Sequence, residues 1–311
     1  MIFSRIAGTG SYLPAKILTN QELERMVETT DAWIQERTGI RERRISAEGE
    51  STTDLAEKAL QQALQAAGRS AAELDLILVA TCTQDCSFPS TAVRVQHRLG
   101  IKGIPAFDLN AACSGFIYGL SIGDAFIRAG QGRCVAVIGA ERMSSITDWS
   151  DRSTCILFGD GAGAVILEAT DQQGIISTHI HADGQYEDLL YHDVAQNTII
   201  MKGNEVFRVA VRTLERIAAD TLAANKLDKK NLDWLIPHQA NLRIMLATAA
   251  KLGLPEERVI VTVDVHGNTS AASIPLALDV GVRSNRIKRG EILLMESFGA
   301  GFTWGSALVR Y

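Results

Sequence analysis

The chain has no long hydrophobic segment, few cysteines and no excess of positive charge. Its 311 residues contain no run of about 18 apolar residues and no apolar leader at the start, so we expect no membrane span. The five cysteines form no Cys-x-x-Cys pair, and the six histidines have no ligand spacing to them, which argues against a disulfide scaffold and a zinc site. A formal net charge of −5 argues against a nucleic-acid-binding surface. These absences are typical of a soluble cytoplasmic enzyme without a metal cofactor.

The sequence instead shows a regular alternation of strand-like and helical segments. Short apolar runs predict strands at 74–81, 104–109, 134–140, 163–168, 232–237, 259–265, 291–297 and 306–310. Periodic apolar residues predict helices at 54–67, 92–99, 116–128, 207–224, 242–252 and 274–282. The polar stretch 170–204 is the loosest part of the chain. This alternation predicts an α/β fold with largely buried sheets.

The second part of the chain repeats features of the first in the same order. Residues 64–78 align without a gap on 222–236, Leu-Gly pairs end helices at 99–100 and 252–253, 107–114 align on 263–270, and Phe-Gly-x-Gly occurs at 158–161 and 298–301. We therefore expect two similar halves, 1–170 and 171–311, packed about a pseudo-twofold axis. In this alignment Cys113 lies beside Thr269, so Cys113 and Asn268 should converge.

Cys113 is the candidate nucleophile because it lies between a predicted buried strand and a predicted helix. At a helix N-terminus the free backbone N–H groups and the helix dipole favour a thiolate and can also hold an oxyanion. Small residues at 111, 112, 114 and 115 leave room for a substrate carbonyl. The alternative is an inert, buried structural cysteine.

His238 follows an apolar strand-like run, at the strand end where α/β sheets place their sites. It is a candidate general base or hydrogen-bonding group, although it could also be an ordinary loop histidine. His266 is the second candidate base, and it ranks lower because it aligns with Asn110 in the repeat. Together Cys113, His238 and Asn268 offer a nucleophile and two groups able to bind a thioester carbonyl or an enolate.

Several motifs resemble the β-ketoacyl-acyl-carrier-protein synthase III family over essentially the whole chain. They are Ala-Ala-Cys-Ser-Gly-Phe at 111–116, Pro-His-Gln-Ala-Asn-Leu-Arg at 237–243, His-Gly-Asn-Thr-Ser-Ala-Ala-Ser at 266–273, the segment 31–44, and the segment that begins with Phe298, Gly299, Ala300 and Gly301. The resemblance implies a thiolase-like fold, with two duplicated halves forming one layered α-β-α-β-α catalytic unit, and a homodimer. It also implies a Cys113–His238–Asn268 triad.

By the same resemblance, Cys113 takes an acetyl group from acetyl-CoA, and His238 and Asn268 stabilise the enolate formed when malonyl-ACP loses CO2. The product is acetoacetyl-ACP, from the first condensation of type II fatty-acid synthesis, and no cofactor is needed. The glycine-rich segment at 298–301 would bring a second backbone N–H to the oxyanion hole. Ala300 stands where the family pattern has glycine, which would be costly if this position required positive φ.

The resemblance also implies contacts with the substrates. For CoA these are Trp33, Arg37, Arg152 and Asn241, and for the acyl carrier protein Gln239, Ala240, Asn241, Leu242 and Arg243, with Arg208 and Lys251 nearby. The acyl pocket would contain Met143, Phe158 and Leu190, with Phe88 reaching across from the partner subunit. Two alternatives remain open: a relative in secondary metabolism that uses another acyl-CoA starter or acceptor, and a non-catalytic member of the fold.

Overall fold

The computed structural model describes residues 2–311, and its first half is built on one mixed five-stranded sheet. The strand order is β1 (Phe3–Tyr12), β7 (Asp160–Thr170), β6 (Cys134–Arg142), β4 (Leu76–Ala80) and β5 (Ala106–Leu109). β4 runs parallel to β5 and β6, whereas β7 runs antiparallel to β6 and β1. β5 is therefore an edge strand.

The second half repeats this topology in a four-stranded sheet. Its order is β8 (Ile175–Ala182), β13 (Thr303–Arg310), β12 (Ile292–Gly299) and β11 (Trp234–Pro237). These strands match β1, β7, β6 and β4 in order and in direction. The repeated topology supports our interpretation of the chain as two duplicated halves.

The counterpart of β5 is reduced to one bridge between Leu235 and Val259, so the strand expected at 259–265 is wrong. The chain turns into the short helix α9 (Val263–His266) instead. The cause is Gln239, whose side-chain oxygen accepts the backbone N–H groups of Thr262 (2.8 Å) and Val263 (3.1 Å). Those donors are therefore not available to a neighbouring strand.

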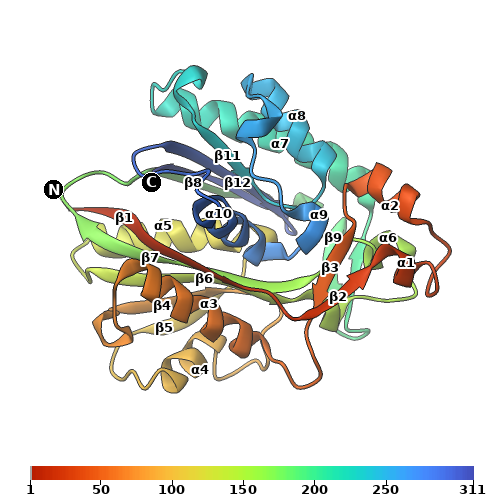
Figure 1. Ribbon diagram of the computed structural model, residues 1–311, viewed down its shortest axis with the longest axis horizontal. Coiled ribbons are helices and arrows are strands. Elements are labelled where there is room, and N and C mark those ends of the chain that lie inside the picture. The colour runs from red at the N-terminus through yellow and green to blue at the C-terminus, as the bar shows by residue number, and fades with distance from the viewer. Residues whose placement is uncertain (1) are drawn as a thin grey trace.

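Helices cover both sheets and also separate them, in the five layers that the sequence predicts (Figure 1). α3 (Thr52–Ala67) and α4 (Thr91–Arg98) cover the outer face of the first sheet, and α7 (Gly203–Ala224) and α8 (Leu242–Leu252) cover that of the second. Between the sheets lie α5 (Gly115–Arg128) and α10 (Ser273–Arg283). The order is thus α-β-α-β-α.

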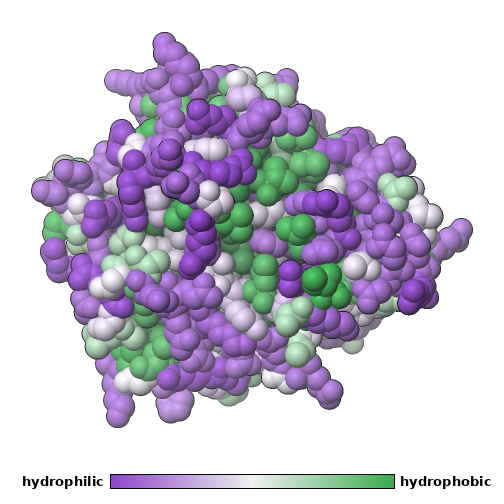
Figure 2. Space-filling model, in the orientation of Figure 1, coloured by the Kyte–Doolittle hydropathy of each residue, from purple (hydrophilic) through white to green (hydrophobic). Residues whose placement is uncertain are grey.

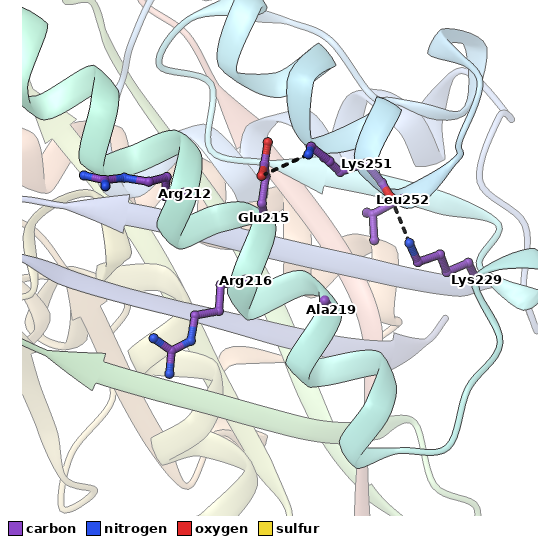
Figure 3. Close-up of a pocket in the computed structure, with 7 residues that line it drawn as sticks. All are labelled: Arg212, Glu215, Arg216, Ala219, Lys229, Lys251 and Leu252. Carbon is purple, nitrogen blue, oxygen red and sulfur yellow. Dashed lines mark hydrogen bonds and ion pairs between the residues drawn. The ribbon is translucent and has the colours of Figure 1, made fainter.

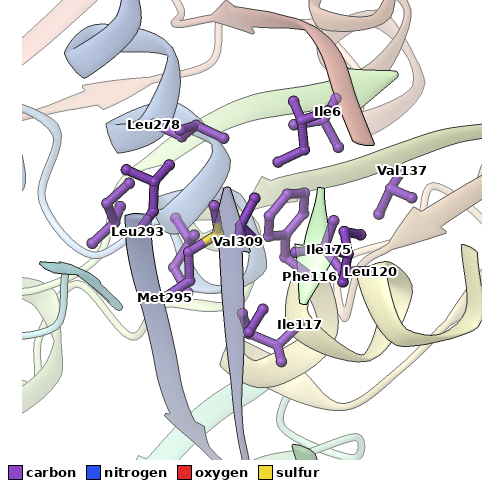
Figure 4. Packing of buried hydrophobic residues seen from close by; sticks show 14 of the residues in the cluster. Ile6, Phe116, Ile117, Leu120, Val137, Ile175, Leu278, Leu293, Met295 and Val309 are labelled. Atoms are coloured by element: carbon purple, nitrogen blue, oxygen red, sulfur yellow. The ribbon is translucent and has the colours of Figure 1, made fainter. Parts of the chain in front are cut away.

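The central core joins the middle helices to both sheets (Figure 4). Phe116 and Leu120 of α5 and Leu278 of α10 are fully buried together with Val137 of β6 and Met295 of β12. Burying a side chain of this size stabilises a fold by roughly 1.5–3 kcal/mol relative to leaving it exposed. This packing fixes the N-termini of α5 and α10 relative to each other.

The remaining elements are short. They are β2 (Lys16–Thr19), α1 (Asn20–Leu23), α2 (Asp31–Thr38), β3 (Glu42–Ile45), α6 (Arg152–Cys155), β9 (Leu190–Asp193) and β10 (Thr198–Met201), with 3₁₀ turns η1 (Ala71–Glu73), η2 (Ala112–Ser114), η3 (Met143–Ile146), η4 (Gly184–Tyr186), η5 (Lys229–Asn231), η6 (Glu256–Arg258) and η7 (Ser270–Ala272). The stretch 170–204, expected to be the loosest, contains β8, β9 and β10. These strands are largely half-buried or exposed, so they lack a continuous apolar run.

The face shown in Figure 2 is mostly hydrophilic, with apolar side chains showing through in patches near its middle. Within residues 2–311 no helix combines the length and the apolar character needed to cross a bilayer.

Candidate active site

Cys113 lies in η2, immediately before α5, on a turn that a side-chain hydrogen bond shapes. Asn110 Oδ1 accepts the N–H of Ala112 at 3.1 Å, and Ala112 has a left-handed φ of 46°. Gly115 comes two residues later. A Cβ added to Gly115 would lie only 2.9 Å from the Cβ of Ala80, so a larger residue could not pack against the end of β4. The turn holds Cys113, partly exposed, at the start of the helix.

The second half contains the same turn at Asn268. Asn268 Oδ1 accepts the N–H of Ser270 at 2.9 Å, Ser270 has a φ of 48°, and η7 leads into α10. Asn268 is therefore the counterpart of Asn110, at the same spacing that separates Leu64 from Leu222. This corrects the predicted alignment of 107–114 with 263–270: Cys113 corresponds to Ala271 and not to Thr269.

The two turns pack against each other. A Cβ on Gly115 would lie 3.4 Å from the Cβ of Ala271, and the hydroxyl of Ser270 is a hydrogen-bond partner of the Cys113 thiol. Burial raises the pKa of Cys113 to about 12; the Ser270 hydrogen bond opposes this rise, and the Glu141 carboxylate adds to it. The expected thiolate is thus not favoured here, because loss of hydration outweighs the helix N-terminus. Burial therefore favours the thiol form of Cys113.

His238 follows β11, and its ring is fixed by Ser273. The backbone N–H of His238 donates to Glu296 O at 2.8 Å, and its Nδ1 lies 2.6 Å from Ser273 Oγ. The N–H of Gln239 donates to the same serine oxygen at 3.3 Å, which leaves the serine proton free to point at Nδ1, an arrangement compatible with the imidazole proton on Nε2. Burial lowers the pKa of His238 to about 3. The ring is therefore a neutral donor, which fits an enolate-binding role better than a general base.

Asn268 is held by its backbone and by one end of its side chain. Its N–H donates to Leu157 O at 2.8 Å, and its C=O accepts the N–H of Gly159 at 3.0 Å. Because Oδ1 is used by Ser270, the Nδ2 amide is the end that can donate to a substrate. β12 links two of the three candidates: Glu296 O accepts the N–H of His238, and the hydroxyl of the next residue, Ser297, donates to Cys113 O at 2.7 Å.

The segment Phe298–Gly301 closes over the Cys113 backbone. A Cβ on Gly299 would lie 2.8 Å from the backbone N of Cys113, so only glycine fits there. Thr303 Oγ1 donates to Ala111 O at 2.8 Å and thereby ties the start of β13 to the same turn. Gly301 has a φ of 128°, whereas Ala300 is not among the residues with positive φ, so alanine carries no backbone penalty at that position.

Two arginines from different parts of the chain lie near the Trp33 ring. The Arg152 guanidinium of α6 is 4.8 Å from the indole centre, and that of Arg37 on α2 is 5.7 Å away. Asn241 donates to Arg37 O at 2.8 Å and accepts the N–H of Arg243 at 2.9 Å, so both ends of its amide are in use. Asn241 therefore positions Arg37 and starts α8.

One residue of the expected carrier-binding segment cannot contact a partner. Gln239 is fully buried, and its amide donates to Pro237 O and Ile260 O and accepts from two backbone N–H groups, so that prediction is wrong. Ala240 and Leu242 are half-buried, and Leu242 packs on Gly39. Arg243 is exposed over Phe207, at 5.5 Å from its ring centre.

Two arginines beside this segment belong to none of the sequence motifs. Arg212 and Arg216 follow Arg208 at four-residue spacing on α7 and line a groove of about 340 Å³ with Lys229 and Lys251 (Figure 3). Lys251 lies 3.8 Å from Glu215, the one acidic residue of this lining. The four-residue spacing was the signal that could have revealed this basic surface.

Met143, Phe158 and Leu190 lie together in one apolar cluster with Ile146, Leu157, Ile199 and Cys82. Phe88 is outside this cluster and is 86% exposed.

The second candidate base, His266, is buried, and burial and Arg44 lower its pKa to about 4. Within the described chain, no group of three or more His, Cys, Asp or Glu residues could hold a metal ion.

Comparisons with known proteins cover both halves of this site. A family model described as 3-oxoacyl-[acyl-carrier-protein (ACP)] synthase III matches residues 107–184, and its C-terminal counterpart matches residues 222–311. A protein named β-ketoacyl-[acyl-carrier-protein] synthase III from Thioalkalivibrio sulfidiphilus is 58% identical over 322 residues, with 100% of each chain covered.

Solved structures are similar over the same length. The 3-oxoacyl-[acyl-carrier-protein] synthase III of Aquifex aeolicus has a TM-score of 0.97 and 49% identity, over 99% of this chain and 100% of that one. A priming β-ketosynthase from a polyketide biosynthetic pathway has a TM-score of 0.94 and 38% identity, over 99% of this chain and 96% of that one. With this thiolase-like fold and these relatives, the chain belongs to the β-ketoacyl-[acyl-carrier-protein] synthase III family of condensing enzymes.

Proposed function

We propose that this chain initiates type II fatty-acid synthesis by condensing an acetyl group from acetyl-CoA with malonyl-ACP. The observation that carries the proposal is the pair of donors arranged around the Cys113 turn. His238 is a neutral imidazole fixed through Ser273, and Asn268 is an amide whose oxygen is already bound by Ser270. Two donors of this kind can hold one oxygen that becomes negative during reaction.

In the first half-reaction, the Cys113 sulfur attacks the carbonyl carbon of acetyl-CoA. The new S–C bond replaces the bond to the CoA sulfur, and CoA leaves as the thiol with the Cys113 proton. We assign the oxyanion of this step to the backbone N–H of Cys113 and the 298–301 segment, and the packing of Gly299 against the Cys113 amide supports this assignment.

In the second half-reaction, malonyl-ACP loses CO2 and its thioester becomes an enolate. The enolate oxygen accepts from His238 Nε2 and Asn268 Nδ2, and the carbanion attacks the acetyl carbon on Cys113. The Cys113 sulfur then leaves as a thiolate and takes a proton from solvent, because its original proton departed with CoA. Loss of CO2 generates the carbanion, so no side chain has to remove a proton from carbon, which agrees with the low pKa of His238, about 3.

The proposed CoA site is the group of Trp33, Arg37 and Arg152. A flat indole and a guanidinium can enclose a purine, and arginines suit the phosphates. Arg208, Arg212 and Arg216 on α7, with Arg243 and Lys251 on α8, form the basic surface that we assign to the acidic carrier protein.

We also propose that two copies pair along the edge strand β5 and act in the cytoplasm. Phe107 on this strand is 41% exposed and Phe88 is 86% exposed, and large apolar side chains of this kind are suited to a protein interface. All five cysteines are free, which fits a reducing compartment. Sedimentation of the protein with and without Phe107→Asp tests the pairing, which predicts a dimer only for the wild type.

The central test is intact-mass analysis after mixing the protein with acyl-CoAs of different chain length. We expect an acetyl adduct on Cys113 that clears on addition of malonyl-ACP, and no adduct on Cys113→Ala, which still binds CoA. His238→Ala and Asn268→Ala should acylate but release CO2 from malonyl-ACP poorly. Normal CO2 release by both variants, or an adduct on Cys113→Ala, would contradict the assigned roles.

A second candidate function is priming in secondary metabolism, favoured by the similarity to a polyketide priming enzyme at 38% identity. It would keep the chemistry and change the starter or the acceptor. Preference for a longer or branched acyl-CoA, or use of malonyl-CoA without malonyl-ACP, would select it. No adduct with any acyl-CoA would select a non-catalytic role.

A further inference from the structure

A second thiol lies beside the proposed nucleophile and has no part in the condensation. Cys82 follows β4, and its Sγ is 3.9 Å from Ser270 Oγ. Ser270 lies on η7, which packs against the η2 turn that carries Cys113, and its hydroxyl opposes the rise in the pKa of the Cys113 thiol. The two sulfurs therefore adjoin one hydroxyl group, and both cysteines are partly exposed.

A buried carboxylate lies on the other side of Cys82. Glu141, near the end of β6, is fully buried, and its Oε1 accepts from the Cys82 thiol at 3.3 Å. Its oxygens also accept from the Cys82 N–H at 3.1 Å and from the Thr83 hydroxyl at 2.5 Å. These contacts fix the loop that carries Cys82 and place a proton acceptor at its sulfur.

The other cysteines have different surroundings. Cys86 faces Pro89 O at 3.5 Å and the Arg94 guanidinium at 3.7 Å, and Cys134 and Cys155 are buried in β6 and α6. Among the described residues, only Cys82 and Cys113 have Ser270 as a neighbour of the thiol. Cys82 is thus the one thiol placed to react with an oxidised Cys113.

We propose that Cys82 is a resolving thiol, which converts peroxide-oxidised Cys113 into a reversible Cys82–Cys113 disulfide. Hydrogen peroxide oxidises the Cys113 sulfur by two electrons to a sulfenic acid, and its O–O bond is reduced to give water. The Cys82 sulfur then attacks the Cys113 sulfur, the S–O bond breaks, and hydroxide leaves. Glu141 takes the Cys82 proton and passes it to the hydroxide, so the second step also yields one water. A thiol reductant regenerates both cysteines by exchange.

The disulfide would preserve the nucleophile. Without a neighbouring thiol, a sulfenic acid proceeds to sulfinic and sulfonic acids, which thiols cannot reduce. The formation of this disulfide needs two thiols and an oxidant, so it does not depend on which acyl group the enzyme uses.

Peptide mapping of the peroxide-treated, full-length protein tests the proposal directly. Trypsin combined with a protease that cleaves before aspartate gives separate peptides for Cys82 (75–84), Cys86 (85–94) and Cys113 (108–123). We expect 75–84 linked to 108–123 under non-reducing conditions, and an intact mass lower by about 2 Da that a reductant restores. Absence of this linked pair while Cys113 carries extra oxygen would overturn the proposal.

Two variants provide the comparison. After peroxide and then reductant, wild type and the control Cys86→Ser should regain most of their untreated thiol labelling at Cys113. Cys82→Ser should regain little, with Cys113 heavier by about 32 or 48 Da. Equal recovery in Cys82→Ser and wild type would also overturn the proposal. Acylation of the untreated proteins is measured separately, so failure of the proposed condensation would be visible on its own.

Discussion

Ser273 Oγ lies 2.6 Å from His238 Nδ1, and through this contact the serine can act on which ring nitrogen carries the proton. Because the hydroxyl also accepts the N–H of Gln239, it can donate to Nδ1 and keep Nε2 protonated towards the substrate. Replacing Ser273 with alanine should therefore slow decarboxylation of malonyl-ACP about tenfold, or about 1.4 kcal/mol. Acylation of Cys113 should change little.

The measurement is the rate of CO2 release by pre-acetylated enzyme, compared with single-turnover acylation. Ser273→Thr keeps the hydroxyl and is the matched control, with near wild-type CO2 release expected. A Ser273→Ala enzyme that released CO2 at the normal rate would show that the serine does not set the imidazole tautomer.

Gly299 should tolerate no side chain, because its backbone lies against the Cys113 amide. A Cβ there would be 2.8 Å from Cys113 N and 3.1 Å from Ser114 N, closer than real Cβ contacts. Gly299→Ala should lower the acylation rate by about 100-fold or more, comparable to loss of an oxyanion-hole donor. Gly184→Ala is the control, since nothing lies within 4 Å of its Cβ position. Acylation kinetics on both variants, with circular dichroism to check folding, would decide the matter.

Most of the fold and the candidate triad could be predicted from the sequence, because apolar runs and distinctive motifs mark them directly. The repeat was detected, but its register at the active site was not. Asn110 and Asn268 share a turn defined by a side-chain hydrogen bond and a left-handed residue two positions later, and neither feature is visible in residue similarity.

The direction in which side chains point was the other feature that could not be predicted from the sequence. Gln239 belongs to a motif segment that was expected to face a partner, yet it is fully buried and holds the chain that replaces a strand. Cys82 and Glu141 carried no motif, and they become notable only because β4 and β6 are adjacent in the sheet. Partner contacts of this kind depend on packing between segments distant in the sequence.

The Trp33 site predicts a separation between binding and chemistry. Arg152→Ala should raise KM for acetyl-CoA by about 5- to 30-fold with a small change in kcat, corresponding to about 1–2 kcal/mol for a cation–π contact. Arg258→Ala is the matched control, because Arg258 is also exposed and lies 5.3 Å from a tryptophan ring, that of Trp234, which is outside the proposed CoA site. Initial-rate kinetics should show the KM effect in the first variant alone, and an equal effect in both would remove Arg152 from the CoA site.

Glu296 predicts a pH dependence of stability. It is fully buried on β12, and burial raises its pKa to about 8, with the Thr248 hydroxyl opposing this rise. Since the carboxyl is protonated more readily in the folded chain than at the model-peptide pKa of about 4.3, its contribution to stability is complete at low pH. That contribution is lost as pH rises from about 4.3 through the folded pKa of about 8.

Glu296→Gln should remove this loss, so that the difference in Tm between variant and wild type moves in favour of the variant between pH 5 and pH 8.5. Reading the slope with pH, and not the Tm at one pH, separates the titration from any cost of burying the glutamine amide. Glu187→Gln, at an exposed carboxylate, is the control and should follow the wild type. Parallel Tm curves for wild type and Glu296→Gln over this range would mean that Glu296 is ionised in the folded protein, and that a cation or water not contained in the described chain holds it.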